Sequence, residues 1–228
     1  MKNIAIILAG GIGSRVGGST PKQLLPLKDG RSVLEHSVDA FEQSPVIDEI
    51  AIVMHPDWLN EAQAIVGRNN WQKVKKIIPG GKERWESSWN AIEAYSHQPS
   101  EVSHLPLALW LHDCARPFVS QRILSDVAEA LEKHPAVTVA VPATDTIYIT
   151  ENNRLVSMPA RSTVLRAQTP QSFRLDVIRQ AYEKALATGN IAATDDTGIV
   201  HKYMPEQSVF IVPGEEANRK ITFIEDLK

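Results

Sequence analysis

The sequence predicts an α/β fold, a single domain built on a Rossmann-like, mostly parallel sheet with a protruding β-arm. Strand-like and helix-like segments alternate from the start of the chain. No repeat or linker-like stretch divides the 228 residues, and a hairpin pattern interrupts the alternation near residue 145. A chain of this length can bury a substantial core as one domain, here residues 1–228.

The alternation begins with a β-branched run at residues 4–8, followed by apolar residues at helical spacing over 32–42. The strands are apolar runs rather than alternating patterns, which is typical of a sheet buried on both faces. The later expected strands are 49–54, 74–78, 107–111, 136–141, 164–167 and 208–212, and the later helices are 57–66, 83–95, 122–132, 175–187 and 195–201.

Residues 145–150 and 154–158 are predicted to form a β-hairpin around the polar turn 151–153. Apolar side chains alternate with polar ones along both strands, so the hairpin leaves an apolar face in water unless a partner covers it. We therefore expect residues 143–163 to be an inserted arm for dimerisation and the protein to be a homodimer.

Composition excludes several classes of protein. The 24 Lys and Arg against 27 Asp and Glu give a net charge of −3, so no broad basic field exists to hold a nucleic acid. The single cysteine, Cys114, cannot form an intramolecular disulfide or a cysteine-rich zinc site, which favours a reducing compartment. No apolar run has the length of a signal-peptide core or a membrane span. We expect a soluble, cytoplasmic protein without a membrane partner.

A glycine-rich stretch with two cations, Arg15 and Lys22, follows the first predicted strand. Glycines let backbone N–H groups approach phosphate oxygens, and the cations supply charge, so the stretch is expected to bind phosphate. It is not a dinucleotide fingerprint, because Val16 takes the place of the last glycine of GxGxxG and Pro21 interrupts the expected helix. It is not a P-loop either, since Gln23 stands where a Ser or Thr would bind magnesium.

The segments LAGGIGSR, residues 8–15, and PKQLLPL, residues 21–27, resemble the opening of nucleotidyltransferases that make CDP-, UDP- and GDP-linked sugars and alditols. Residues 80–87, GGKERWES, resemble the GGxxRxxS stretch of the cytidylyltransferases for methylerythritol phosphate and ribitol phosphate. The resemblance implies a nucleotidyltransferase-type fold and CTP as the nucleotide. The positions that it implies bind the nucleotide are Ala9, Gly10, Gly11, Gly13, Gly81, Ser87 and Lys220.

Asp113 and Arg116 follow a buried strand, where ligands bind in open α/β sheets. A carboxylate suits Mg²⁺ that bridges nucleotide phosphates, and an Arg three residues later can reach an acceptor phosphate. We expect Asp113 to hold the metal and Arg116 to bind the acceptor. The neighbouring His112 is interpreted as a structural residue and takes no part in the mechanism.

In the family that the chain resembles, a Thr and an Arg of the arm reach across the dimer to the acceptor substrate, and a Thr-Pro-Gln segment lies at the same site. These positions correspond to Thr146, Arg161 and Thr169. The partners implied are therefore CTP, a small polyol phosphate and a second copy of the chain.

The resemblance implies transfer of CMP from CTP to the phosphate of 2-C-methyl-D-erythritol 4-phosphate, with release of pyrophosphate, in isoprenoid precursor synthesis. Arg15 and Lys22 are the predicted catalytic residues, which stabilise charge at the α-phosphate with Mg²⁺ as cofactor. The acceptor phosphate is already an anion, so no general base is required.

Other functions stay open. Tyr148 and Ala160 depart from the residues common in methylerythritol enzymes, and Pro159 favours a ribitol-5-phosphate cytidylyltransferase that makes CDP-ribitol for cell-surface polymers. A hexose-1-phosphate nucleotidyltransferase would share only the first loop. A non-catalytic nucleotide-binding protein is the alternative outside the enzymes.

Overall fold

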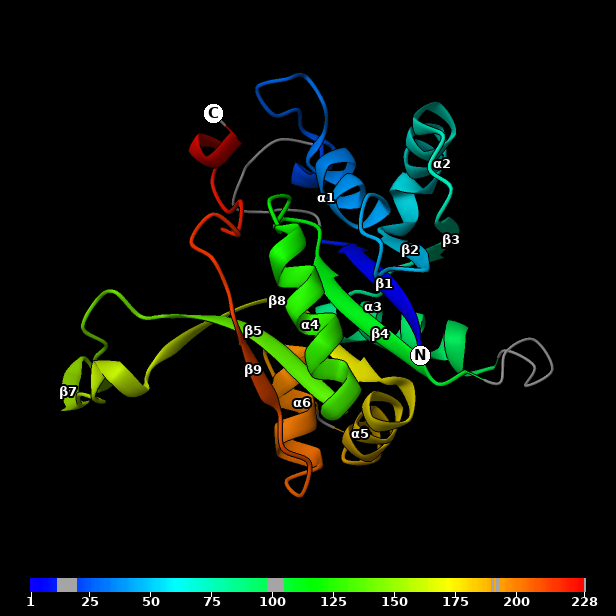
Figure 1. The fold of residues 1–228 in the computed structure, drawn as a ribbon. Coiled ribbons are helices and arrows are strands. Elements are labelled where there is room, and N and C mark those ends of the chain that lie inside the picture. Colours follow the sequence, from blue (N-terminus) through cyan, green and yellow to red (C-terminus); the bar gives the residue numbers. More distant parts are fainter. Residues whose placement is uncertain (12–19, 98–104, 190, 192, 228) are drawn as a thin grey trace.

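Nine strands and six α-helices are assigned in the computed structural model, which describes residues 1–11, 20–97, 105–189, 191 and 193–227. The strands of the main sheet are β1 (Lys2–Ala9), β2 (Glu49–Met54), β3 (Val74–Pro79), β4 (Leu107–Asp113), β5 (Ala136–Pro142), β8 (Leu165–Arg174) and β9 (Phe210–Pro213). They lie in the order β3-β2-β1-β4-β8-β5-β9 (Figure 1). Only β8 runs antiparallel to its neighbours in this sheet, so the predicted mostly parallel sheet is confirmed.

Helices cover both faces of the sheet. Ile4 and Ile6 of β1 pack into one core, whereas Ala5 and Ile7 pack into the other, because successive side chains of a strand point to opposite faces. The helices α1 (Val33–Glu42), α2 (Leu59–Asn69) and α4 (Gln121–Lys133) lie on one face, and α3 (Arg84–Ser96), α5 (Leu175–Ala187) and α6 (Asp196–Tyr203) lie on the other. No described helix is both long enough and apolar enough to cross a bilayer.

Side-chain caps fix where several helices begin. Ser32 and Glu35 form a capping box at α1, with the Ser32 N–H donating to Glu35 Oε2 at 2.8 Å. Asp195 caps α6, since its Oδ1 accepts from the backbone N–H of Gly198 at 2.8 Å. A cap of this kind stabilises a helix by about 1 kcal/mol. These caps account for the helices expected from residues 32 and 195.

Strand β8 is longer than the four residues expected at 164–167, and that boundary was wrong. Proline cannot donate to the ladder and is therefore unfavourable within a central strand. The structure accommodates Pro170 where the register shifts between Thr138 and Val139 of β5, which pair with Gln171 and Gln168. Thr169 and Pro170 therefore lie in an interruption of the ladder, and the strand continues beyond them.

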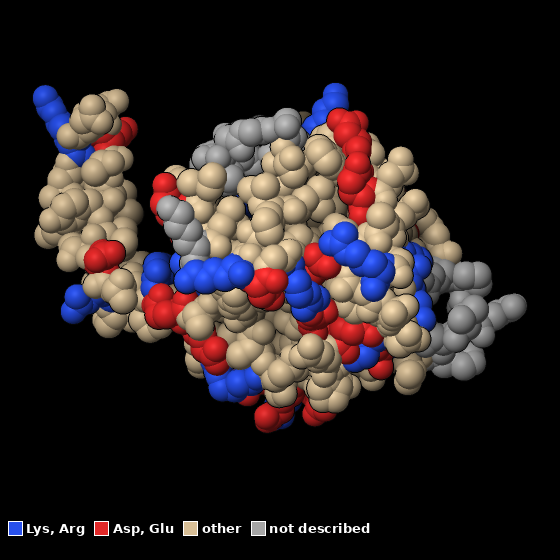
Figure 2. Space-filling model, turned by 90° about the horizontal axis from the view of Figure 1, so that it is seen from above, with Lys and Arg blue, Asp and Glu red and all other residues tan. Residues whose placement is uncertain are grey.

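The predicted hairpin is present as β6 (Ile149–Glu151) and β7 (Arg154–Ser157), although its strands are shorter than expected. Asn152 and Asn153 form the two-residue turn with φ values of 47° and 59°, the left-handed conformation that such turns require. Figures 1 and 2 show the arm set apart from the body, and Figure 2 shows charged side chains at both ends of the arm with an uncharged surface between them. Its exposed apolar side chains are Tyr148, Ile149, Leu155, Val156 and Met158.

The sheet topology creates a crevice beside β1. From β1 the chain proceeds through β2 to β3 on one side, and then returns to place β4 on the other side. Strands β1 to β4 are parallel, so their carboxyl ends share one edge, and Leu8 of β1 is paired with Asp113 of β4 there. Ligands of open α/β sheets bind at such a switch point.

Candidate active site

A cleft of about 420 Å³ opens at this switch point. It is lined from the ends of β1, β3 and β4, from the segment after residue 20 and from the C-terminal segment. The predicted site residues that line it are Ala9, Gly10, Gly11, Lys22, Gly81, Ser87, Asp113 and Lys220. The structure therefore brings these widely separated residues together in one cleft. The predicted residues Gly13 and Arg15 lie outside the described part of the chain.

The turn after β3 packs tightly on the start of α3. A Cβ atom at Gly81 would lie 2.1 Å from the Cβ of Glu86, so only glycine fits. The Gly81 N–H donates to Ser87 Oγ at 3.1 Å, and a Cβ at Gly10 would lie 3.0 Å from the same oxygen. Ser87 thus holds the turn after β3 against the loop after β1, and both form one wall of the cleft.

Gln23 fixes the loop after β1 and was not predicted as a site residue. The side chain is 3% exposed, and its amide donates to the carbonyls of Ala9 and Gly11, the latter at 2.8 Å. The amide therefore fixes the backbone where phosphate binding is expected. Its position directly after Lys22 was visible in the sequence, but the burial that gives it this role was not.

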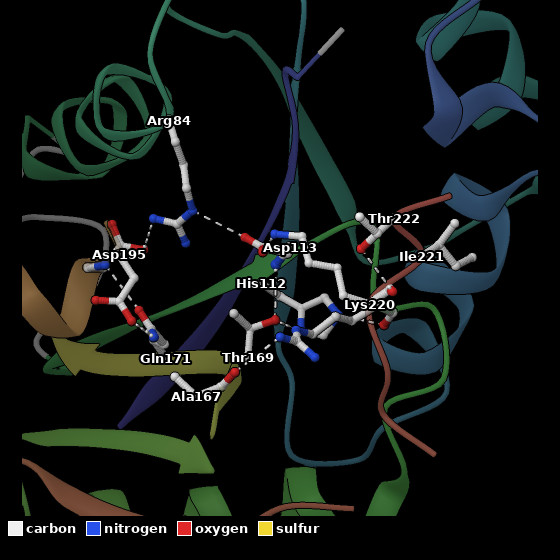
Figure 3. A network of polar contacts seen from close by, with 12 residues as sticks. Arg84, His112, Asp113, Ala167, Thr169, Gln171, Asp195, Lys220, Ile221 and Thr222 are labelled. Atoms are coloured by element: carbon white, nitrogen blue, oxygen red, sulfur yellow. Dashed lines mark hydrogen bonds and ion pairs between the residues drawn. The ribbon is translucent and has the colours of Figure 1, made fainter. Parts of the chain in front are cut away.

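Asp113 is the central carboxylate of the cleft. Its Oδ1 lies 3.2 Å from Arg84 Nε, and its Oδ2 lies 2.6 Å from Lys220 Nζ (Figure 3). Burial alone would raise the pKa of Asp113, but the charges of Arg84 and Lys220 outweigh it and hold the pKa well below its usual range. The side chain is consequently ionised at neutral pH and carries a negative charge beside the cleft.

Arg84 is the main functional candidate that the sequence analysis missed. It lies at the first position of α3 and lines the cleft between Asp113 and Asp196, with Nη1 2.8 Å from Asp196 Oδ2. Burial alone would lower the pKa of Arg84, but the negative charges of Asp196 and Asp113 raise it by a larger amount. The guanidinium therefore stays charged. The GGxxRxxS pattern contained this Arg, but nothing in the pattern indicated two acidic partners.

The C-terminal segment is anchored so that Lys220 enters the cleft. Asn218 is fully buried, and its amide donates to Thr169 O at 2.9 Å. The Ile221 N–H donates to Ala115 O at 2.8 Å, and the Ile221 carbonyl accepts from Lys22 Nζ at 2.8 Å. The segment therefore holds Lys22 and Lys220 on the same side of the cleft.

Thr169 lies behind Asp113 rather than in the cleft. Its hydroxyl accepts from the Asp113 N–H at 3.1 Å and lies 3.1 Å from His112 Nδ1, while His112 Nε2 lies 2.9 Å from Arg116 O. Because a carbonyl can only accept, Nε2 carries the proton and Nδ1 accepts from Thr169. Burial lowers the pKa of His112 to about 4, so the ring is neutral, as its predicted structural role requires.

Arg116 is engaged with the backbone. Its Nη1 donates to Asn218 O at 2.8 Å and its Nη2 donates to Ala167 O at 3.1 Å, and burial lowers its pKa. Arg116 and Thr169 are absent from the described lining of the cleft. Both therefore join β8 and the C-terminal segment to the end of β4 in this chain.

Thr146 and Arg161 are exposed on the arm and are likewise absent from the described lining of the chain's own cleft. Arg161 Nη1 donates to Thr144 O at 3.3 Å, a contact within the arm. Their predicted role at an acceptor site of a neighbouring subunit stays a prediction.

The available donor atoms suit a metal ion whose coordination is completed by the substrate. Among the described residues no group of three His, Cys, Asp or Glu side chains comes together. Asp113 is one hard oxygen donor on the cleft wall, and Mg²⁺ is commonly held by one or two carboxylates together with substrate phosphates. The residues present therefore fit a metal shared with a nucleotide, and not a metal enclosed by protein.

The fold and the cleft define the class. The features are those of a nucleotidyltransferase: a doubly wound sheet, a glycine turn at its switch point and a carboxylate at the end of β4. Four cationic side chains surround the same cavity, namely Lys22, Lys82, Arg84 and Lys220. Residues 3–228 match the family model described as IspD, 2-C-methyl-D-erythritol 4-phosphate cytidylyltransferase. The chain belongs to this family and is a CTP-dependent enzyme.

Three similar proteins match this chain over nearly all of its length. A 2-C-methyl-D-erythritol 4-phosphate cytidylyltransferase of Thermobifida fusca is 43% identical over 98% of this chain and 89% of its own length. A bifunctional ribulose 5-phosphate reductase/CDP-ribitol pyrophosphorylase of Haemophilus influenzae is 40% identical over 99% of this chain and 47% of its own length. The solved 4-diphosphocytidyl-2C-methyl-D-erythritol synthase of Anaerococcus prevotii is 29% identical, with a TM-score of 0.84 over 99% of this chain and 94% of its own.

Proposed function

We propose that the protein transfers CMP from CTP to the phosphate of 2-C-methyl-D-erythritol 4-phosphate and releases pyrophosphate. The observation that carries the proposal is the meeting of Lys22, Lys220 and Asp113 with the turn between Gly81 and Ser87 in one cleft. Phosphoryl-type transfer needs alignment of the reacting oxygens and stabilisation of charge more than covalent help from the protein. This cleft offers both.

The glycine turns receive the nucleoside, and the lysines receive its phosphates. The backbone around Gly10, Gly11 and Gly81 allows close approach of a base and ribose. Lys22 stabilises the negative charge that develops at the α-phosphate. Lys220 gives up its contact with Asp113 and binds the departing pyrophosphate instead. Arg15 is proposed to assist Lys22.

Asp113 is proposed to hold Mg²⁺ together with the triphosphate. Bound there, Mg²⁺ would neutralise phosphate charge and polarise the phosphorus that is attacked. The chain itself orients Asp113 through Thr169 and Arg84 and keeps it ionised. No protein base is assigned, because the acceptor phosphate is an anion at neutral pH.

The acceptor site is proposed to be shared between two subunits of a homodimer. The arm exposes apolar side chains together with Thr146 and Arg161, and a second copy of the chain is the occupant that we assign to it. Arg161 would then bind the acceptor phosphate from the neighbouring subunit, with Arg116 and Thr169 holding the floor of the site.

Pyrophosphate release tests the proposal. The purified protein is incubated with CTP, UTP, GTP or ATP, with and without methylerythritol phosphate, in the presence of Mg²⁺. Release should require CTP and the acceptor together. Release with UTP or GTP and a hexose 1-phosphate would contradict the proposal, and binding of CTP without any turnover would favour a non-catalytic role.

Ribitol 5-phosphate is the second candidate acceptor, and two observations favour it. The Haemophilus influenzae protein with the CDP-ribitol name is 40% identical to this chain, within the range of 36% to 43% given by the methylerythritol enzymes of Geobacter metallireducens and Thermobifida fusca. Tyr148 is 61% exposed on the arm and Ala160 lies beside Arg161, where methylerythritol enzymes commonly have other residues. The number of methylerythritol enzymes among the similar proteins places that acceptor first.

A further inference from the structure

A buried carboxylate, Asp196, takes no part in the proposed reaction but is electrostatically connected to the cleft. It is fully buried at the start of α6. Its Oδ1 accepts from Tyr182 Oη at 2.6 Å, and its N–H donates to Gln171 Oε1 at 3.1 Å. Tyr182 is itself buried and stacked on Trp89. The position of this carboxylate is therefore fixed from several sides.

Arg84 connects this carboxylate to Asp113. The contact of Nη1 with Asp196 measures 2.8 Å, whereas that of Nε with Asp113 measures 3.2 Å, and Figure 3 shows Arg84 reaching toward both sides. A buried carboxylate is costly unless it is paired with a cation. Asp196 consequently neutralises much of the positive charge of Arg84.

We propose that Asp196 neutralises Arg84 and thereby keeps the negative charge of Asp113 available to a divalent cation, and this proposal rests on the function proposed above. Arg84 contacts Oδ1 of Asp113 through Nε. Because Asp196 neutralises Arg84, the negative charge of Asp113 stays available to a divalent cation on its Oδ2 side.

The geometry assigns different tasks to the two oxygens of Asp113. Oδ1 faces Arg84, which is paired with the buried Asp196, and Oδ2 faces the ammonium of Lys220, whose side chain is 38% exposed. Lys220 can therefore leave Oδ2 for a nucleotide phosphate, whereas Arg84 is held in place by Asp196. Oδ2 is the oxygen that a cation in the cleft would meet.

The charge balance of the cluster shows why Asp196 matters. Asp113 and Asp196 balance Arg84 and Lys220 in this structure. When Lys220 moves to the nucleotide, one negative charge remains and attracts a cation. Without the charge of Asp196, Arg84 would neutralise Asp113, and that attraction would be lost.

The test is Mn²⁺ binding in the presence of CTP, measured by electron paramagnetic resonance without acceptor and therefore without turnover. Asp196→Asn keeps the shape of the side chain and an oxygen for Tyr182, but removes the charge. The Mn²⁺ concentration at half-saturation should rise about ten-fold or more, the range found when partners of metal ligands are changed. The affinity for metal-free CTP should stay nearly unchanged.

Two control variants separate charge from structure. Tyr182→Phe removes the hydrogen bond to Asp196 but keeps the carboxylate, so Mn²⁺ half-saturation should stay at the wild-type value. Asp126→Asn makes the same chemical change in an exposed pair with Arg122 at 2.6 Å, and it should also have no effect. The double variant Arg84→Gln, Asp196→Asn removes both charges and should return half-saturation to the wild-type value or below it.

An unchanged half-saturation in folded Asp196→Asn would overturn the proposal, and so would an equal shift in Tyr182→Phe. If Asp196→Asn does not fold, the double variant decides, because a ten-fold weaker Mn²⁺ affinity there contradicts the charge argument. Wild-type protein that transfers CMP without binding Mn²⁺ would also overturn it. Wild-type protein that binds Mn²⁺ with CTP but transfers nothing would instead refute the proposed function.

Discussion

Lys220 Nζ lies 2.6 Å from Asp113 Oδ2, so that the C-terminal segment and the end of β4 meet across the cleft. Each group partly neutralises the other in the structure described here. A triphosphate competes for Lys220, and a divalent cation competes for Asp113. The ion pair thus holds both side chains in the cleft. A metal–nucleotide complex would separate them, because its phosphates bind Lys220 and its cation binds Asp113.

Lys220→Gln is expected to lower kcat by about 10²-fold, because an oriented cation at the departing pyrophosphate is lost. The KM for CTP should rise less than kcat falls. Steady-state kinetics with varied CTP checks both values, and the adjacent Arg219→Gln serves as control, since Arg219 is exposed and paired with Asp226. Equal losses in the two variants would remove Lys220 from the reaction.

Thr169→Val should destabilise the fold by about 1–3 kcal/mol, because the Asp113 N–H and His112 Nδ1 both lose a buried partner. Thr169→Ser keeps the hydroxyl and should recover most of the stability. Chemical denaturation measures the free energy of unfolding. The exposed Thr163→Val is the control and should change it by less than about 0.5 kcal/mol. Wild-type stability in Thr169→Val would show that the hydroxyl bridge contributes nothing.

The free energy of unfolding should depend on pH through His112. Its pKa is about 4 in the folded protein against 6.5 as a free side chain, mainly because burial disfavours the charged ring. Between these values the unfolded chain binds the proton and the folded protein does not. Stability is therefore fully present above pH 6.5 and falls as the pH drops toward 4, by a total of the order of 3 kcal/mol.

Comparing wild type with His112→Gln isolates this contribution. The variant should show a shallower fall in the free energy of unfolding between pH 6.5 and pH 4. Identical slopes in the two proteins would mean that His112 is protonated in the fold or is accessible to water.

The succession of strands and helices along the chain and the presence of the hairpin arm could be predicted from the sequence, because each depends on local signals. Hydrophobic runs, the glycine turn at Gly81 and the strand-end position of Asp113 are visible without tertiary structure. The roles of Arg84 and Gln23 were missed, since each depends on distant partners and on burial. The full extent of β8 was also missed, because the bulge opposite Pro170 arises from its pairing with β5.

The composite acceptor site gives a complementation test. Arg161→Ala should raise the KM for the acceptor and leave CTP binding intact, and Lys22→Ala should abolish turnover while the acceptor site stays whole. If the arm serves the neighbouring subunit, a mixed dimer of the two variants contains one site with both lesions and one with neither. Mixing should therefore restore activity that neither parent shows.

Subunit exchange must be confirmed independently, for example with differently tagged chains purified in sequence. A confirmed mixed dimer without activity would show that the arm acts on its own chain. A protein that is monomeric in sedimentation at working concentration would contradict the shared site directly.

An internal competition tests the central claim most directly. Limiting CTP is offered with equal concentrations of methylerythritol 4-phosphate and ribitol 5-phosphate, with Mg²⁺, and the products are followed by ³¹P NMR. The account predicts a diphosphate diester that joins cytidine to methylerythritol as the main product, with one pyrophosphate released for each CTP consumed. A predominance of CDP-ribitol would contradict the assigned acceptor, and CTP that remains intact or is only hydrolysed would contradict the assigned reaction.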